Sequence, residues 1–115
     1  MGELIMLLFH ARTTAHVLHL KTRSFAVHKA LEDFYEGIID LADSIAEAHQ
    51  GCEGLITASP ARYTPYEDPL LLMSSLYDWI DANRDRLSDE TQIQNLIDEV
   101  LALINSTTYK LKFLK

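Results

Sequence analysis

The sequence predicts an all-α protein, a four-helix bundle with one long connection between two helical hairpins. Apolar residues recur at spacings of three and four in four separate stretches, which is the pattern of amphipathic helices. The 115 residues contain four glycines and three prolines, and five of these seven lie between positions 51 and 69. Long stretches without helix breakers on either side of this region favour one bundle domain over residues 1–115.

The first hairpin is expected to join helices over about 3–21 and 25–50. The first helix carries one apolar face formed by Leu4, Leu8, Ala11, Ala15 and Leu18. Ser24 is a good N-cap for the second helix, and Gly51 is expected to end it. At 26 residues the second helix has a length of about 39 Å, suited to the spine of a bundle.

Residues 52–67 form the expected central connection. Asp68 and Pro69 then provide an N-cap and a first helical residue. The third helix is expected to end near 83–86, and the fourth to run from Ser88 or Asp89 to about Leu111. A connection of this length can place the second hairpin parallel or antiparallel to the first, and periodicity leaves both arrangements open.

Composition restricts the possible partners. The chain has 10 Lys+Arg against 17 Asp+Glu, a net charge of −7, which argues against general nucleic-acid binding. Its single cysteine, Cys52, excludes an intramolecular disulfide and a cysteine-rich zinc site. The apolar run at 4–9 is too short for a signal peptide or a membrane span. We therefore expect a cytoplasmic protein without a membrane partner.

One set of residues on the second helix predicts chemistry. The spacings 4, 11 and 4 place these residues on one broad helical stripe. Imidazole and carboxylate groups are suitable ligands for Fe, Mn or Zn. The alternative interpretation is a solvated helix flank with ordinary i,i+4 contacts. The set consists of His28, Glu32, Asp43 and Glu47.

These four residues cannot form one site within a single chain, because His28 and Glu47 lie about 28 Å apart along a helix. Two copies of the helix that cross antiparallel about a two-fold axis near position 37.5 resolve this problem. The axis places His28 opposite Glu47 of the partner subunit, and Glu32 opposite Asp43 of the partner subunit. Gly37 lies beside the axis, where it would allow two helices to approach closely. The pattern thus predicts a two-fold dimer with two shared metal sites.

The same residues carry a resemblance to a known family. The stretch from His19 to Tyr35, HLKTRSFAVHKALEDFY, followed by Asp43-Ser-Ile-Ala-Glu47, resembles the core of the Dps proteins (DNA protection during starvation), especially short phage-encoded members. The resemblance implies a ferritin-like fold and a ferroxidase site shared across a two-fold dimer. It implies Fe(II) oxidation by peroxide or dioxygen, with iron as the expected metal. The implied ligands are His19, His28, Glu32, Asp43 and Glu47.

Several positions depart from the family pattern. Leu20 replaces an aromatic residue, and Glu32 replaces the usual aspartate. A shorter turn makes His16 a competitor of His19. A lysine-rich N-terminal tail is missing, so DNA binding is not expected, and the last two helices look short for a dodecameric shell. These departures favour an alternative function, a non-catalytic phage-encoded interaction or assembly protein with a vestigial site, located in the host cytoplasm.

Three further features of the sequence are candidates for a functional role. Cys52 has no neighbouring residue in the sequence that marks it as a nucleophile. The basic, amphipathic segment 109–115 can touch a partner or a phosphate, or form a helix end with favourable cations. Four aromatic residues around the central connection can line a pocket, although bundle packing is the simpler interpretation. They are Tyr63, Tyr66, Tyr77 and Trp79.

Overall fold

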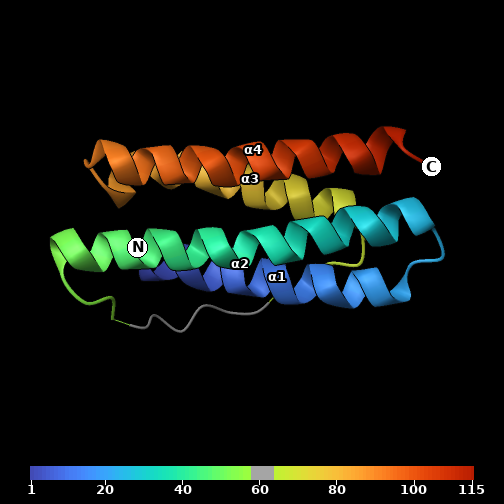
Figure 1. Cartoon of the computed structure of the whole chain (residues 1–115), viewed down its shortest axis with the longest axis horizontal. Helices are drawn as coiled ribbons and strands as arrows, with labels where there is room; N and C mark the ends of the chain where they lie inside the picture. Colours follow the sequence, from blue (N-terminus) through green and yellow to red (C-terminus); the bar gives the residue numbers. More distant parts are fainter. Residues whose placement is uncertain (58–63) are drawn as a thin grey trace.

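The computed structural model describes residues 1–57 and 64–115, and these residues form four helices and no strand. The all-α prediction is therefore confirmed. The first hairpin contains α1 (Gly2–Lys21) and α2 (Phe25–Glu53), and the second contains α3 (Pro69–Leu87) and α4 (Thr91–Phe113). Figure 1 shows the four helices aligned along the long axis of the molecule, which measures 43 × 25 × 22 Å.

The two hairpins are joined by a crossover. Helix α2 lies beside α1 and α4, whereas α3 lies beside α4 and α1. Lys110 near the end of α4 contacts Asp33 near the start of α2, and Arg86 at the end of α3 contacts Glu3 at the start of α1. Both neighbouring pairs are thus antiparallel, so α2 and α3 run in the same direction (Figure 1). The central connection must therefore join opposite ends of the bundle, which decides between the two arrangements that periodicity left open.

Local capping explains most helix ends. The Ser24 hydroxyl accepts the backbone N–H of Val27 at 3.2 Å, and the Asp68 carboxylate accepts that of Leu70 at 3.1 Å. The predicted end of α2 at Gly51 is wrong, because the helix continues to Glu53. Gly54 ends it with a φ of 102°, a conformation that glycine adopts readily.

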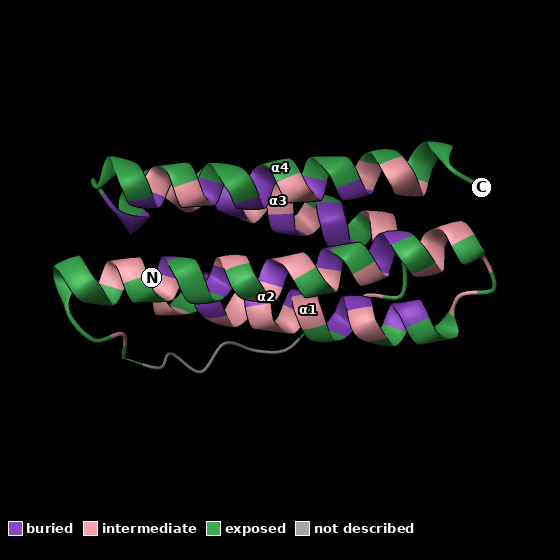
Figure 2. Ribbon diagram, in the orientation of Figure 1, coloured by how far each residue is buried: buried purple, intermediate pink, exposed green. Residues whose placement is uncertain are grey.

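The core runs along the bundle axis where the inner stripes of all four helices meet (Figure 2). Phe34, Ile38 and Ile45 of α2 are fully buried, as the spacing of apolar residues predicts. A Cβ atom added to Gly37 would lie 3.2 Å from Leu103 Cδ2 of α4. The glycine therefore lets α2 and α4 approach within one chain. The expected role of Gly37 in the approach of two copies is not needed to explain the glycine, because a helical pattern does not show which neighbour a glycine faces.

Within the described residues, no helix is both long enough and apolar enough to cross a membrane.

Candidate metal site

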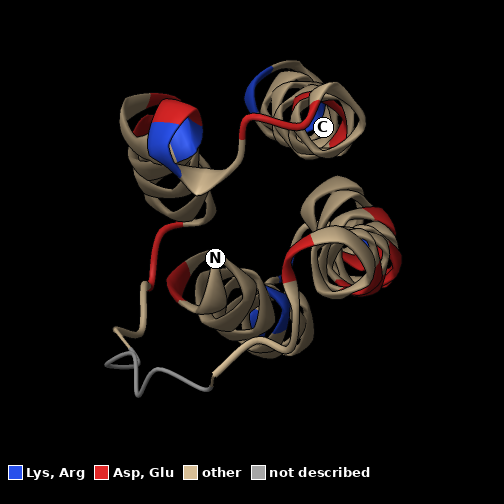
Figure 3. Cartoon of the chain, turned by 90° about the vertical axis from the view of Figure 1, so that its left-hand side faces the viewer, with Lys and Arg blue, Asp and Glu red and all other residues tan. Residues whose placement is uncertain are grey.

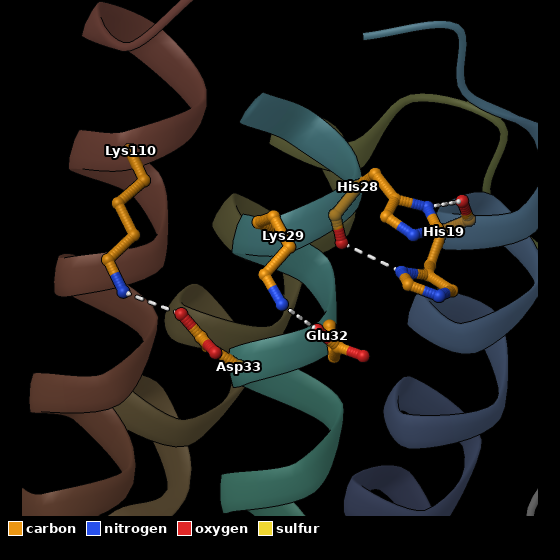
Figure 4. Close-up of polar contacts among 6 residues, drawn as sticks. All are labelled: His19, His28, Lys29, Glu32, Asp33 and Lys110. Carbon is orange, nitrogen blue, oxygen red and sulfur yellow. Dashed lines mark hydrogen bonds and ion pairs between the residues drawn. The ribbon is translucent and has the colours of Figure 1, made fainter. Parts of the chain in front are cut away.

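Two histidines are joined by hydrogen bonds and ring stacking at the turn of the first hairpin. His19 lies in the last turn of α1 and His28 in the first turn of α2. The distance from His19 Nδ1 to the carbonyl oxygen of His28 is 2.7 Å, and that from His28 Nδ1 to the carbonyl oxygen of His19 is 2.8 Å. The rings stack with centroids 3.6 Å apart and an angle of 18° between planes (Figure 4).

This pairing determines which nitrogen of each ring is available. A carbonyl oxygen only accepts hydrogen bonds, so each Nδ1 must carry the proton that it donates. In the neutral ring the lone pair then resides on Nε2. Metal-binding histidines usually hold their rings in the same way, with the second nitrogen donating to a carbonyl or carboxylate. The hairpin therefore fixes two imidazoles in a tautomer suited to metal binding.

Glu32 supplies a carboxylate one helical turn after His28. Its side chain accepts a hydrogen bond from Lys29 (Figure 4). This hydrogen bond and the Lys29 charge hold the pKa of Glu32 below its ordinary value, with smaller contributions from positive charge on His19 and His28. The same contact raises the pKa of Lys29. An ionised carboxylate thus lies one helical turn from His28, paired with Lys29, but within one chain His19, His28 and Glu32 do not form a group arranged to hold a metal ion.

The competition between His16 and His19 is decided by packing. The His19 side chain is buried, with 6% of its surface exposed, and stacks on His28. The His16 ring stacks instead on Tyr35, with centroids 4.2 Å apart, and meets His19 edge to face at 5.9 Å. Arg12 lies over the other side of this cluster, 5.6 Å from the centre of the Tyr35 ring. His19 is therefore the α1 residue placed against His28.

Sequence reasoning missed Tyr35 and Arg12 as neighbours of the site. A signal was present: residues 12, 16 and 19 have spacings of four and three, and so do residues 28, 32 and 35. Matching 4–3 spacings on two antiparallel helices place both sets along one seam. Tyr35 adds a phenol ring and Arg12 a fixed positive charge beside the imidazoles.

Asp43 and Glu47 lie away from this cluster. Both are exposed on α2, and Asp43 is about 16 Å along the helix from Glu32. Neither forms an ion pair among the described residues. Among all described residues, His19, His28 and Glu32 included, no group of three or more His, Cys, Asp or Glu residues is arranged to hold a metal ion. The predicted ligand set is thus divided into an ordered half and an exposed half, separated along one helix.

Two other features of the sequence have a structural explanation. Cys52 is exposed, and desolvation followed by the charges of Glu53 and Glu90 raises the pKa of its thiol, which disfavours a nucleophilic role. Tyr66 and Trp79 line a cavity of about 130 Å³ between α1 and α3. Tyr77 lines a different cavity, between α3 and α4. Tyr63, also named as a candidate, lies outside the described residues.

The fold and this cluster define a class of protein: a four-helix bundle with one crossover, carrying an imidazole–carboxylate cluster on its first hairpin. The chain belongs to a family of unknown function (DUF5856), whose profile matches residues 19–111 and so spans all five predicted ligands.

The chain is also similar to the uncharacterized 14.6 kDa protein in the mobD-ri intergenic region of Enterobacteria phage T4. The two are 28% identical over 115 residues, which cover 95% of this chain and 85% of that protein. No solved structure matches the chain. Neither comparison names a Dps or ferritin family, so that resemblance stays a prediction.

Proposed function

We propose that this phage-type protein binds Fe(II) and promotes its oxidation at a site completed by a second copy of the chain. The observation that carries the proposal is the reciprocal hydrogen bonding of His19 and His28. It fixes the position and tautomer of two imidazoles, one of them a helical turn before Glu32, without a metal. Preorganised ligands of this kind lower the cost of ordering the site when a metal binds.

The chemistry of the ligands suits iron. Imidazole nitrogen is a good ligand for Fe(II), and carboxylates are hard anions that favour Fe(III). Oxidation removes one electron from each Fe(II), and a peroxide molecule accepts two. Adding Asp43 and Glu47 of the partner subunit would bring the negative charge that stabilises the oxidised ion. The chain's net charge of −7 also favours collection of cations.

The outer surface of α1 supports a second copy. Between residues 4 and 20, Arg12 is the one Asp, Glu, Lys or Arg side chain. Surface helices of monomers normally place several charges toward solvent. Here Val17 and Leu20 are exposed instead. An apolar outer surface beside an incomplete ligand set is expected if both are covered by the same partner.

Complementation between two inactive variants tests the proposal. One variant carries His28→Gln and Glu32→Gln, and the other carries Asp43→Asn and Glu47→Gln. Each alone should fail to oxidise Fe(II), because every site in its dimer lacks half of its ligands. Mixed subunits should recover about a quarter of the wild-type rate, since half of the dimers are mixed and each has one intact site.

The control is wild-type protein taken through the same mixing step, with circular dichroism to verify folding of all chains. A mixture with no more activity than its components contradicts a shared site. Wild-type protein that does not accelerate Fe(II) oxidation under peroxide or dioxygen contradicts the ferroxidase activity itself.

A second candidate function is a non-catalytic assembly or interaction protein. The observation that favours it is that His19 and His28 satisfy each other's backbone carbonyls without a metal. Stabilising the hairpin through these hydrogen bonds would be a sufficient role for both histidines. One variant distinguishes the two functions. If the protein is an assembly protein, Asp43→Asn/Glu47→Gln should form its complex as the wild type does, and neither the wild type nor the variant should oxidise iron.

A further inference from the structure

Two segments far apart in the sequence lie at the same end of the bundle. Residues 21–29 span the end of α1, the turn and the start of α2, and residues 110–115 form the end of α4 (Figure 1). The Lys110–Asp33 contact connects the two regions. The bundle is 25 × 22 Å across, so both segments belong to one small end surface.

This surface holds most of the cations of an acidic protein, together with two carboxylates just before α3: Glu67 lines one cavity with Lys21, and Asp68 lines another with Lys112. The two segments contain six of the ten Lys+Arg residues and no Asp or Glu. Lys29 pairs with Glu32, and Lys110 pairs with Asp33. Among the described residues the other four cations form no ion pair, and so they remain available to a partner. They are Lys21, Arg23, Lys112 and Lys115.

The opposite end of the bundle is acidic. Figure 3 looks onto this end, where α2 finishes at Glu53 and the connection between α3 and α4 contains Asp89 and Glu90. Of the Lys and Arg side chains in the described residues, the two near this end are both paired: Arg84 with Asp98, and Arg86 with Glu3. Cations without an ion pair are therefore concentrated toward one end of the 43 Å axis of the molecule, among the described residues.

The basic end also exposes large apolar side chains. Phe25 and Phe113 are 77% and 70% exposed. Of the large apolar residues exposed in the described part of the chain, only Leu55 lies near the other end. We define the basic apolar end as the four cations without an ion pair together with five exposed side chains: Phe25, Leu71, Tyr109, Phe113 and Leu114.

We propose that the basic apolar end binds the surface of a bilayer that contains anionic lipids. Cations attract the lipid headgroups, and aromatic and aliphatic side chains at helix ends enter the interfacial layer. The acidic far end is repelled, so the bundle axis should stand away from the membrane plane. Such surface binding requires no membrane-spanning helix. It is independent of the proposed iron site, because none of the four cations or exposed side chains is a predicted ligand.

Nucleic acid fits the surface less well. A duplex is longer than the 25 Å end and would extend past it toward the acidic remainder of the chain. Contacts to phosphate groups would also leave exposed apolar side chains such as Phe25 and Phe113 without a binding partner. An anionic bilayer uses both the charges and the apolar groups.

Vesicle co-sedimentation tests the proposal with the full chain. Wild-type protein should sediment with vesicles of equal parts phosphatidylglycerol and phosphatidylcholine, but not with phosphatidylcholine alone. Binding should fall steeply with salt. The pair Lys21→Gln/Lys112→Gln and the pair Phe25→Ser/Phe113→Ser should each weaken binding about tenfold or more.

Matched controls change the same kinds of residue at the other end. Arg84→Gln/Arg86→Gln removes two charges, and Leu55→Ser removes the 88% exposed leucine there. Both should bind like the wild type, with circular dichroism verifying that every variant is folded. The proposal is overturned by absence of sedimentation with anionic vesicles, by equal loss in the controls, or by duplex DNA binding that competes with vesicles and ignores Phe25→Ser/Phe113→Ser.

Discussion

His19 and His28 each donate a ring N–H to the backbone carbonyl of the other, with their rings 3.6 Å apart. The pair joins α1 to α2 across a short turn and leaves both Nε2 atoms unused by these bonds. The same contacts that stabilise the hairpin thus orient the nitrogen atoms that we propose bind iron.

His19→Ala should lower the free energy of unfolding by about 2 kcal/mol, because it removes a buried ring and leaves the His28 carbonyl without its donor. Urea denaturation followed by circular dichroism measures this change. His16→Ala is the matched comparison, since His16 stacks on Tyr35 at a more exposed position, and it should cost less. Equal costs for the two would contradict the special role of the His19–His28 pair.

Gly37→Leu should destabilise the protein by about 1–3 kcal/mol, because the new side chain collides with Leu103. Leu103→Ala in the same chain should restore part of the loss by creating space for it. A double-mutant cycle under urea measures the coupling between the two positions. Simple additivity of the two effects would show that Gly37 does not control the approach of α2 and α4.

Glu32 should make stability depend on acidic pH. Its pKa in the folded chain lies below the ordinary value of 4.5, so the folded state releases the proton more readily than the unfolded state. Its stabilising contribution is present above the ordinary pKa and is lost as the pH falls through the folded value. The stability of Glu32→Gln should therefore fall less than that of the wild type across this acidic window. Urea titrations at several pH values measure the difference, and parallel curves for the two proteins would refute it.

Lys110→Gln should change stability by less than about 1 kcal/mol, because the Lys110–Asp33 pair is solvent-accessible and 3.3 Å long. The small effect should shrink further in high salt. Thermal unfolding of the wild type and the variant at low and high ionic strength measures both the stability change and its dependence on salt. A large, salt-independent loss would mean that Lys110 supports the bundle through packing of its aliphatic chain.

Periodicity and capping predicted the four helices well, because they depend on neighbours within one or two turns. The ends at Ser24 and Asp68 follow from side chains that accept nearby N–H groups. The end of α2 was missed by three residues, since both Gly51 and Gly54 could have adopted the required conformation, and only the backbone shows which one does. Likewise, the 4–11–4 spacing named four candidate ligands and the family resemblance added His19, but neither could show which side chains meet.

The amino-acid sequence by itself determined the number of helices, the apolar stripe of each and the division of the ligand set along α2. Tertiary structure alone decided the crossover, the choice of His19 over His16, the use of Gly37 against Leu103, and the meeting of residues 21–29 with 110–115. The physical reason is the separation in sequence between the residues that interact. Helical hydrogen bonds join residues four apart, whereas these other contacts join residues 9 to 83 positions apart, and their pairing depends on how whole helices pack.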